Sequence, residues 1–312
     1  MFERKTYLRT DIEKLYYNDL PSSVKTQLKA LMSLDIYTKK HIEDVPKYVY
    51  KICKQANLHQ EQIDFAMTAA YLHDVGKIFI KSEILQKNDR LTEEEYEEMK
   101  THTIKGYEIC MSFDELNQYA PVVRGHHENL DGTGYPDGLK DNEISYTTRI
   151  VKVADVYSAL LNKRQYKEAF STRKIFEIIY EDVKNNKTDG EILCLLLSAI
   201  IDDKKEELKE IKHNFNNYVS QLEYNENIFE CLNSYITERM KPENILRKIK
   251  ENKYIHKLEG FEIENFQDIN KLLIYINNNI INLTKSIKQK ENLEKDIKDL
   301  NEFFKLTYKK VK

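Results

Sequence analysis

The scarcity of glycine and proline is the feature that most limits how this chain can fold. The 312 residues contain eight glycines and five prolines, roughly 4% together against a usual share of ~12%. β-Sandwiches and barrels need many tight turns, and those turns depend on these two residue types. The sequence therefore predicts an all-α protein. Four of the eight glycines lie between positions 125 and 138, so one loop departs from this pattern.

Charge and composition exclude several classes of protein. The chain carries 49 basic and 52 acidic residues, so we expect no binding of nucleic acid polymers. The N-terminus lacks an apolar signal-peptide core, and the longest apolar stretch, 192–201, is about half a membrane span. We therefore expect no membrane span. The four cysteines are widely spaced without a CxxC pair, which suits a reducing compartment and predicts a cytoplasmic location.

Apolar residues at helical spacing predict the individual helices. The predicted helices span residues 38–58, 61–74, 92–111, 114–127, 145–161, 171–184 and 190–201, with a loop over 128–144. Pro46 predicts either a kink in the first of these or a helix that restarts with Asp44 as its N-cap. Thr92 and Glu95 predict a capping box.

Three regions follow from this pattern. Residues 1–36 are a helical lead-in with an apolar stripe, 37–202 contain most of the histidines, and 203–312 are rich in Asn, Lys and Glu. The last region has two amphipathic stripes, Ile276, Ile280, Leu283, Ile287 and Leu293, Ile297, Leu300, Phe304. A step of six residues between the stripes breaks the heptad register. We expect an additional helical region here, with dimerisation, regulation by a partner or ligand, and simple packing left open.

The distribution of the histidines indicates a functional site. Six of the eight lie between positions 41 and 127, and Asp155 stands in an apolar helix where an unpaired carboxylate would be costly to bury. A lone histidine is usually structural, and that interpretation is kept for positions 59, 213 and 256. Seven candidate ligands on successive helices favour a metal site instead. They are His41, His73, Asp74, His102, His126, His127 and Asp155.

The residue types suggest which metal chemistry this would be. Imidazoles and carboxylates together suit manganese, iron or zinc, and more than four ligands suit two ions. An aspartate can bridge two ions, and such a pair can hold a bridging hydroxide and neutralise a phosphodiester. Lys77 is placed to bring a positive charge to a phosphate oxygen, and Gly76 to permit a sharp turn after Asp74.

Two motifs resemble a known family. His73-Asp74-Val75-Gly76-Lys77, and His126-His127-Glu128 followed by Asp131-Gly132-Thr133-Gly134-Tyr135-Pro136, look like the HD-GYP branch of the HD metal-dependent phosphohydrolases. The likeness covers about residues 30–200. It implies an HD-type helical bundle that hydrolyses cyclic dinucleotides, chiefly cyclic di-GMP, at a bi- or trinuclear iron or manganese site.

Position by position, the resemblance makes the seven candidates metal ligands, with Asp74 bridging. It gives Asp74 and Lys77 catalytic roles. It places Lys77, Tyr135, Arg164 and Lys167 in contact with substrate. Tyr135 would stack on a base, bond a phosphate or pack the glycine-rich loop, which we expect to be rigid and to contain positive-φ positions.

Four departures from the family pattern matter. Tyr37 stands where trinuclear members carry a glutamate one turn before the first histidine, so we expect two metal ions. Asn129 replaces the usual arginine, and Ser158 stands where the family tends to have an aspartate. Pro46 follows His41 closely enough to shift that ligand.

The leading hypothesis is a phosphodiesterase that cuts cyclic di-GMP to linear pGpG, or to GMP after a second cut. A second hypothesis keeps the chemistry with another cyclic dinucleotide, such as 3',3'-cGAMP, because metal ligands do not read bases. A third is a non-catalytic cyclic-dinucleotide sensor or scaffold. The expected partner is the cyclic dinucleotide, and a homodimer formed through the C-terminal helices is one of the alternatives left open for residues 203–312.

Overall fold

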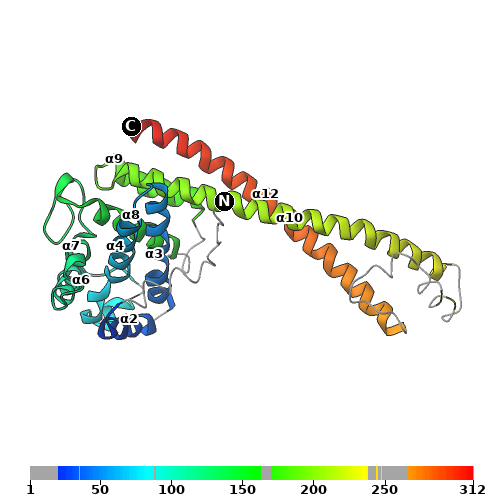
Figure 1. The fold of residues 1–312 in the computed structure, drawn as a ribbon, viewed down its shortest axis with the longest axis horizontal. Helices are drawn as coiled ribbons and strands as arrows, with labels where there is room; N and C mark the ends of the chain where they lie inside the picture. Colours follow the sequence, from blue (N-terminus) through cyan, green and yellow to red (C-terminus); the bar gives the residue numbers. More distant parts are fainter. Residues whose placement is uncertain are drawn as a thin grey trace. The chain divides into compact units, whose positions relative to one another are not determined.

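The fold is all-α, as predicted. The computed structural model describes residues 20–34, 36–87, 89–162, 170–237, 244, 247 and 266–311. Within these ranges the chain forms helices and loops, with a single isolated antiparallel bridge between Asp131 and Lys140. The chain divides into one unit of Met1–Ile201 with Asp299–Lys312 and a second of Asp202–Lys298. The longer helices are labelled in Figure 1.

The first unit is built from short and medium-length helices. They are α2 (Ser22–Leu34), α3 (Ile36–Gln55), α4 (Gln60–Leu72), the 3₁₀ helix η1 (Val75–Phe79), α5 (Ser82–Leu85), α6 (Glu93–Met111), η2 (Asn117–Tyr119), α7 (Ala120–Gly125), η3 (Asp141–Glu143), α8 (Tyr146–Asn162) and α9 (Thr172–Lys184). Helix α10 (Gly190–Thr237) starts in this unit and continues into the second, and α12 (Phe266–Val311) ends in the first.

One apolar core holds the first unit together. It takes Val24 and Leu28 from the predicted stripe of α2, and it includes buried residues of α3, α4, α8 and α10. Leu300 and Phe303, near the end of α12, belong to the same core. The C-terminal segment thus packs with the N-terminal helices, because its apolar side chains complete their buried face.

The second unit consists of the outer part of α10 and most of α12. Ion pairs join the two helices, with 3.1 Å between Lys204 Nζ and Asp296 Oδ2 and 3.1 Å between Lys212 Nζ and Glu294 Oε1. Leu293 from the second predicted stripe is buried, whereas Ile280 from the first stripe is 47% exposed. None of the described helices is long and apolar enough to cross a bilayer.

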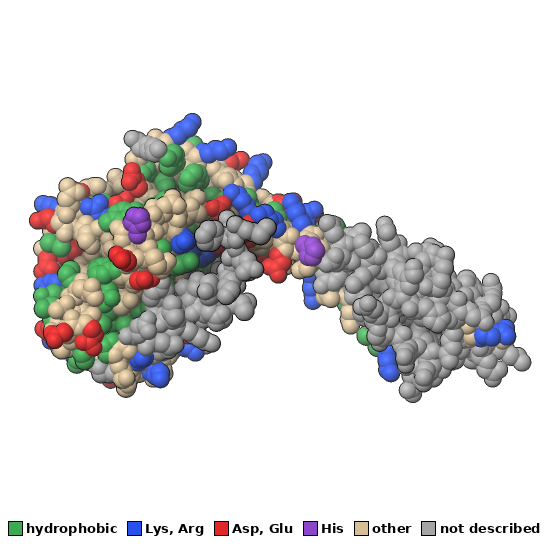
Figure 2. All heavy atoms as spheres, viewed as in Figure 1, with side chains coloured by type: hydrophobic (Ala, Val, Ile, Leu, Met, Phe, Trp, Pro, Cys, Tyr) green, Lys and Arg blue, Asp and Glu red, His purple; other side chains and the backbone are tan. Residues whose placement is uncertain are grey.

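The face of the molecule drawn in Figure 2 bears mixed charge. Lys and Arg side chains lie among Asp and Glu side chains over the described residues of the first unit. A surface on which charges of both signs are interspersed interacts well with water and does not attract a polyanion strongly.

Pro46 does not interrupt its helix, so the predicted restart at Asp44 is wrong. Helix α3 runs through Pro46, and the Asp44 carboxylate accepts a hydrogen bond from Lys47 Nζ at 3.1 Å. Proline removes one helical hydrogen bond. The neighbouring Val45 and Val49 are fully buried against other helices, and this packing outweighs the loss.

The predicted helix over 114–127 is also wrong in its first half. The chain forms η2 and turns there, and α7 starts only at Ala120 with Pro121 in its first turn. Proline favours the first helical turn because its missing N–H would have no partner there in any case. The predicted capping box is confirmed, since Thr92 Oγ1 accepts from the Glu95 N–H and Glu95 Oε2 accepts from the Thr92 N–H.

Two glycines allow η1 to pack directly on α6. A Cβ added at Gly76 would overlap the carbonyl oxygen of His102 and the backbone nitrogen of Gly106. The expectation that Gly76 serves a sharp turn is therefore replaced by a different reason, close contact between two backbones. This contact brings the segment after Asp74 against the helix that carries His102.

Gly76→Ala tests this packing. We expect the free energy of unfolding to fall by about 1–3 kcal/mol, because the added methyl meets backbone atoms that cannot move aside. Urea unfolding followed by circular dichroism measures it. Gly125→Ala is the control, since a Cβ there would meet only side-chain atoms at ordinary contact distances, Thr148 Cγ2 at 3.4 Å and Glu128 Cγ at 3.8 Å. Equal stability of the Gly76→Ala variant and the parent chain would contradict the packing argument.

Candidate metal centre

The structure brings all seven predicted ligands together from separate elements. His41 lies on α3, His102 on α6 and Asp155 on α8. His73 ends α4 and Asp74 follows it as the N-cap of η1, while His126 ends α7 and His127 comes directly after it. Their assignment as ligands remains a prediction, and their geometry can be compared with what a metal requires.

Asp74 lies at the middle of this cluster. Its Oδ2 is 3.2 Å from His73 Nε2 and 3.6 Å from His41 Nε2. Its Oδ1 is 3.5 Å from His102 Nε2 and 3.9 Å from His126 Nε2. The two oxygens of one carboxylate therefore face two different groups of histidines.

Each group has enough donors for an ion. In the first, Asp155 Oδ1 lies 3.0 Å from His41 Nε2 and 3.9 Å from His73 Nε2. In the second, His102 and His126 have their Nε2 atoms 3.4 Å apart, and His127 completes the set. The candidate ligand atoms within each set lie within 4.8 Å of one another. Clusters of this composition can hold divalent transition metals.

Backbone carbonyls orient three of the imidazoles. The Nδ1–H groups of His73, His102 and His126 each donate to the carbonyl oxygen three residues earlier, at 2.7 Å, on Ala70, Met99 and Val123. Each Nε2 is thereby directed toward Asp74. In histidines that bind a metal through one ring nitrogen, the N–H of the other ring nitrogen typically donates a hydrogen bond to a fixed acceptor.

Burial keeps several of these imidazoles neutral. It lowers the pKa of His102 to about 4 and that of His127 to about 3. A neutral imidazole has a free lone pair at neutral pH, which is the form that binds a metal. Burial would raise the pKa of Asp74, but the charges of His73 and Lys77 outweigh it and hold that pKa well below its usual value.

Lys77 is part of the same buried network. Its Nζ lies 2.6 Å from Asp74 Oδ2. Burial lowers the pKa of Lys77, but Asp74 and Asp155 outweigh that effect, so the net pKa is raised and the side chain is a cation at neutral pH. Lys77 therefore supplies a fixed positive charge at the edge of the cluster.

Two buried atoms test whether the cluster fits a cation. Asp74 Oδ1 and His73 Nε2 are buried and make no hydrogen bond within the described residues. Leaving such atoms unsatisfied costs about 1–3 kcal/mol each. Both atoms point into the centre, and a divalent ion bound there would satisfy them, so the donor set fits a metal.

Ser158 is a supporting residue that the sequence did not reveal as one. Its Oγ lies 3.0 Å from His41 Nδ1, although the two residues are 117 positions apart. The serine that replaces the family's aspartate thus holds the first predicted ligand in place. The neighbouring Tyr37 lies in α3, and its side chain is outside the described residues, so the prediction drawn from it stays open.

The glycine-rich loop after the histidine pair is held from inside by one carboxylate. Glu128 is 1% exposed, and its oxygens accept the backbone N–H groups of Asp137, Gly138 and Leu139 at 2.6, 3.1 and 3.1 Å. Gly132 and Gly138 have φ values of 80° and 67°. The predicted positive-φ positions are therefore confirmed at these two glycines.

Lys152 ties this loop to α8. Its Nζ donates to the Glu128 carbonyl oxygen and to Asn129 Oδ1. Asn129 Nδ2 donates in turn to Thr133 Oγ1 at 2.9 Å. Asn129, which replaces the family's arginine, therefore has a local role in the loop. Since Asp155 lies one turn further along α8, the loop and the first ligand group share one support.

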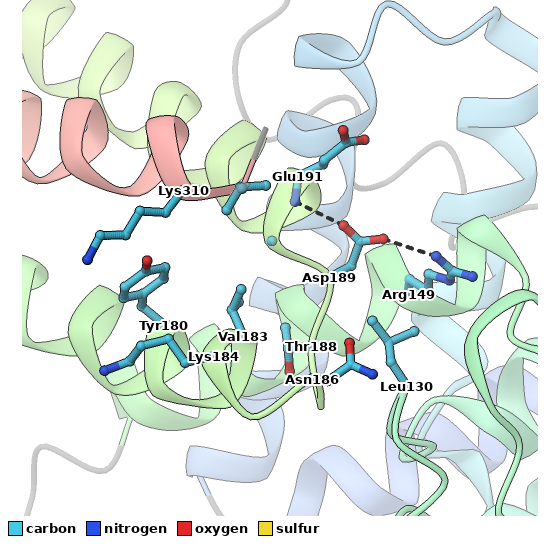
Figure 3. A pocket seen from close by; sticks show the side chains of 12 residues that line it. Leu130, Arg149, Tyr180, Val183, Lys184, Asn186, Thr188, Asp189, Glu191 and Lys310 are labelled. Carbon is cyan, nitrogen blue, oxygen red and sulfur yellow. Dashed lines mark hydrogen bonds and ion pairs between the residues drawn. The ribbon is translucent and has the colours of Figure 1, made fainter.

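Arg149 anchors the other end of the loop (Figure 3). Its guanidinium donates to the carbonyl oxygens of Asp141 and Ile144 and pairs with Asp189 at 3.2 Å. Asp189 also accepts the N–H groups of the first turn of α10. The adjoining pocket, of about 590 Å³, contains none of the predicted site residues, and we interpret these contacts as structural.

The predicted substrate-contacting residues divide into two sets. Lys77 lies in the cluster, and the ring of Tyr135 stacks on His127 with centroids 4.8 Å apart. Burial raises the pKa of Tyr135, so its phenol stays protonated. Arg164 and Lys167 lie outside the described residues.

Comparison with known proteins assigns the family. The HD domain model matches residues 21–192, more than half of the chain. The chain belongs to the HD domain family. Among proteins of known name, it is 37% identical over 154 residues to the cyclic di-GMP phosphodiesterase response regulator RpfG of Xanthomonas campestris, covering 49% of this chain and 41% of that protein.

Two further relatives match about half of this chain. The 3'3'-cGAMP-specific phosphodiesterase 3 of Vibrio cholerae is 34% identical over 53% of this chain and 35% of its own length. A cyclic di-GMP phosphodiesterase of Thermotoga maritima is 34% identical over 56% of this chain and 52% of its own length. This chain therefore spans about half or less of each of these relatives.

Asp74→Asn tests the centre. The amide keeps the shape but loses the charge and one acceptor, so we expect the bound metal measured by mass spectrometry to fall to a small fraction of the parent value. Asp114→Asn, at an exposed position, should keep its metal. A full metal load in Asp74→Asn would contradict the bridging assignment.

Ser158→Ala tests the support of His41. Loss of the hydroxyl frees the imidazole to rotate, and we expect the affinity for Mn²⁺ to fall by about 10–100-fold in a calorimetric titration. Ser33→Ala, whose hydroxyl donates to the Ala30 carbonyl at an exposed position of α2, should bind as the parent does. Unchanged affinity in Ser158→Ala would show that its hydroxyl does not position the ligand.

Proposed function

We propose that this chain is a metal-dependent phosphodiesterase that hydrolyses cyclic di-GMP to linear pGpG, or to GMP after a second cut. The observation that carries the proposal is the Asp74 carboxylate, whose two oxygens face separate groups of histidines. That arrangement suits two ions held a few ångströms apart, the spacing used in phosphodiester hydrolysis.

Two divalent ions, iron or manganese, are part of the proposal. His41, His73 and Asp155 would hold one, His102, His126 and His127 the other, and Asp74 both. Bound there, the ions supply Lewis-acid activation of water and neutralise phosphodiester charge. Buried, neutral imidazoles and an ionised carboxylate are the ligands that this requires.

The chain's own residues would position the substrate. The Lys77 ammonium lies at the edge of the cluster, where it can bind a phosphate oxygen and offset its growing negative charge. Tyr135, protonated and stacked on His127, lies beside the second ligand group, where it can contact the substrate. Arg164 and Lys167 remain proposed contacts on the motif resemblance alone.

The names of the relatives support this class of reaction but do not decide which bases the cyclic dinucleotide substrate carries. RpfG and the Thermotoga protein are named for cyclic di-GMP, and the Vibrio protein for 3'3'-cGAMP. Our proposal takes cyclic di-GMP as the substrate. Residues 37–202 would form the catalytic domain, with 1–36 as its lead-in.

Location and assembly belong to the same proposal. Cys53, Cys110 and Cys194 are unbridged and buried, which supports a reducing compartment such as the cytoplasm. Residues 203–312 would mediate homodimerisation or regulation. Ile280, Ile281 and Ile287, which are 47, 42 and 39% exposed on α12, support the first of these roles.

The test combines metal analysis with a substrate panel. The purified chain, loaded anaerobically with Mn²⁺ or Fe²⁺, is incubated with cyclic di-GMP, 3',3'-cGAMP and bis(p-nitrophenyl) phosphate, and the products are separated by chromatography. We expect two ions per chain and conversion of cyclic di-GMP to pGpG or GMP. Asp74→Asn should lose metal and activity together, whereas Asp114→Asn should keep both.

Three outcomes would change the proposal. Faster cleavage of 3',3'-cGAMP than of cyclic di-GMP would change the substrate and keep the chemistry. Tight binding of cyclic di-GMP with two metals and no turnover would show a sensor. Activity that survives in metal-free Asp74→Asn would remove the proposed centre altogether.

A further inference from the structure

Four aromatic rings form a row that leads from the buried cluster to the surface. His126 is fully buried, and its ring centroid lies 4.2 Å from that of His127. The next ring, Tyr135, lies 4.8 Å from His127, and Tyr96 of α6 lies 6.3 Å from Tyr135. Tyr96 is 44% exposed. The row thus starts at a predicted metal ligand and ends at a ring open to solvent.

Lys100 places a positive charge between the outer two rings. Its Nζ lies 5.4 Å from the centroid of Tyr96 and 5.9 Å from that of Tyr135. It also pairs with Glu97 Oε1 at 2.5 Å, and 26% of its side chain is exposed. Cation–π contact and the ion pair hold a flexible side chain in one place while leaving the ammonium within reach of a ligand.

We propose that Tyr96 and Lys100 form a wall that binds a guanine base of the substrate. This inference rests on the proposed function. A cyclic dinucleotide whose phosphodiester lies at the cluster must place its bases against the surrounding walls. An exposed tyrosine ring offers a stacking surface for a base.

The ammonium adds a preference among bases. Guanine presents two acceptors, O6 and N7, on one edge, whereas adenine presents N7 beside an amino donor. Lys100 has only donors to offer, so it can bond both guanine atoms and meets a like donor on adenine. Tyr96 would bind either purine, and Lys100 would favour guanine.

The experiment distinguishes binding of a base at Tyr96 and Lys100 from hydrolysis of the phosphodiester at the metal cluster. Bis(p-nitrophenyl) phosphate serves as a reporter substrate without a nucleobase. Cyclic di-GMP and cyclic di-AMP are added as competitors, so that an inhibition constant is obtained even for one that is not cleaved. The variants are Tyr96→Ala and Lys100→Met, with Lys105→Met as the control, because Lys105 lies on the same helix and pairs only with Glu108 in the described contacts.

We expect Tyr96→Ala to raise the inhibition constants of both competitors by about tenfold, a usual effect of losing one base stack. Lys100→Met should raise that of cyclic di-GMP by about tenfold and that of cyclic di-AMP much less. All three variants should keep the parent metal content, and Lys105→Met the parent inhibition constants.

Two results would overturn the wall. Unchanged inhibition by cyclic di-GMP in both variants would show that the substrate does not touch it. If a variant weakens inhibition by both competitors and slows cleavage of the reporter to the same extent, or loses its metal, Tyr96 and Lys100 only support the fold. A parent chain that cleaves the reporter but neither binds nor cleaves cyclic di-GMP would overturn the proposed function itself, and the parent reaction alone reveals that case.

Discussion

The Asp74 carboxylate, shared between two groups of imidazoles, is the interaction on which the rest of the site depends. A buried carboxylate needs positive charge or hydrogen bonds around it, and here the charges of His73 and Lys77 outweigh the effect of burial on the pKa of Asp74. Its position requires that α4 end at Leu72 and that η1 start at once, so that His73 and Asp74 project into the same space. The glycine contact between η1 and α6 then brings His102 within reach of the second oxygen.

The loop beside the site obeys a second constraint. A chain of turns at the surface has many unpaired N–H groups, and the buried Glu128 satisfies three of them. Lys152 and Arg149, both on α8, hold the loop at two further points. The helix that carries Asp155 therefore also fixes the loop that carries Tyr135, so one candidate ligand and one proposed substrate contact are supported by the same element.

Much of this could be predicted from sequence, because it depends on local chemistry. Scarce glycine and proline predicted the helices, Thr92 and Glu95 a capping box, and the glycine cluster a loop with positive-φ positions. The prediction failed where distant contacts outweigh local preference. The alternative of a restart at Asp44 failed in this way, because buried neighbours hold α3 through Pro46. The late start of α7 has a local cause that the prediction overlooked, the preference of Pro121 for a first helical turn.

The sequence by itself determined the residue types of the centre, their grouping in two motifs and the class of fold, since these depend on composition and spacing. Only the tertiary structure decided which oxygen of Asp74 faces which histidines and that Ser158 holds His41 across 117 positions. It also decided that Tyr96 continues the ring row from Tyr135 and that the Lys100 ammonium lies beside both of these rings. These relations join residues far apart in the chain, and their distances are set by the packing of whole helices rather than by any local preference.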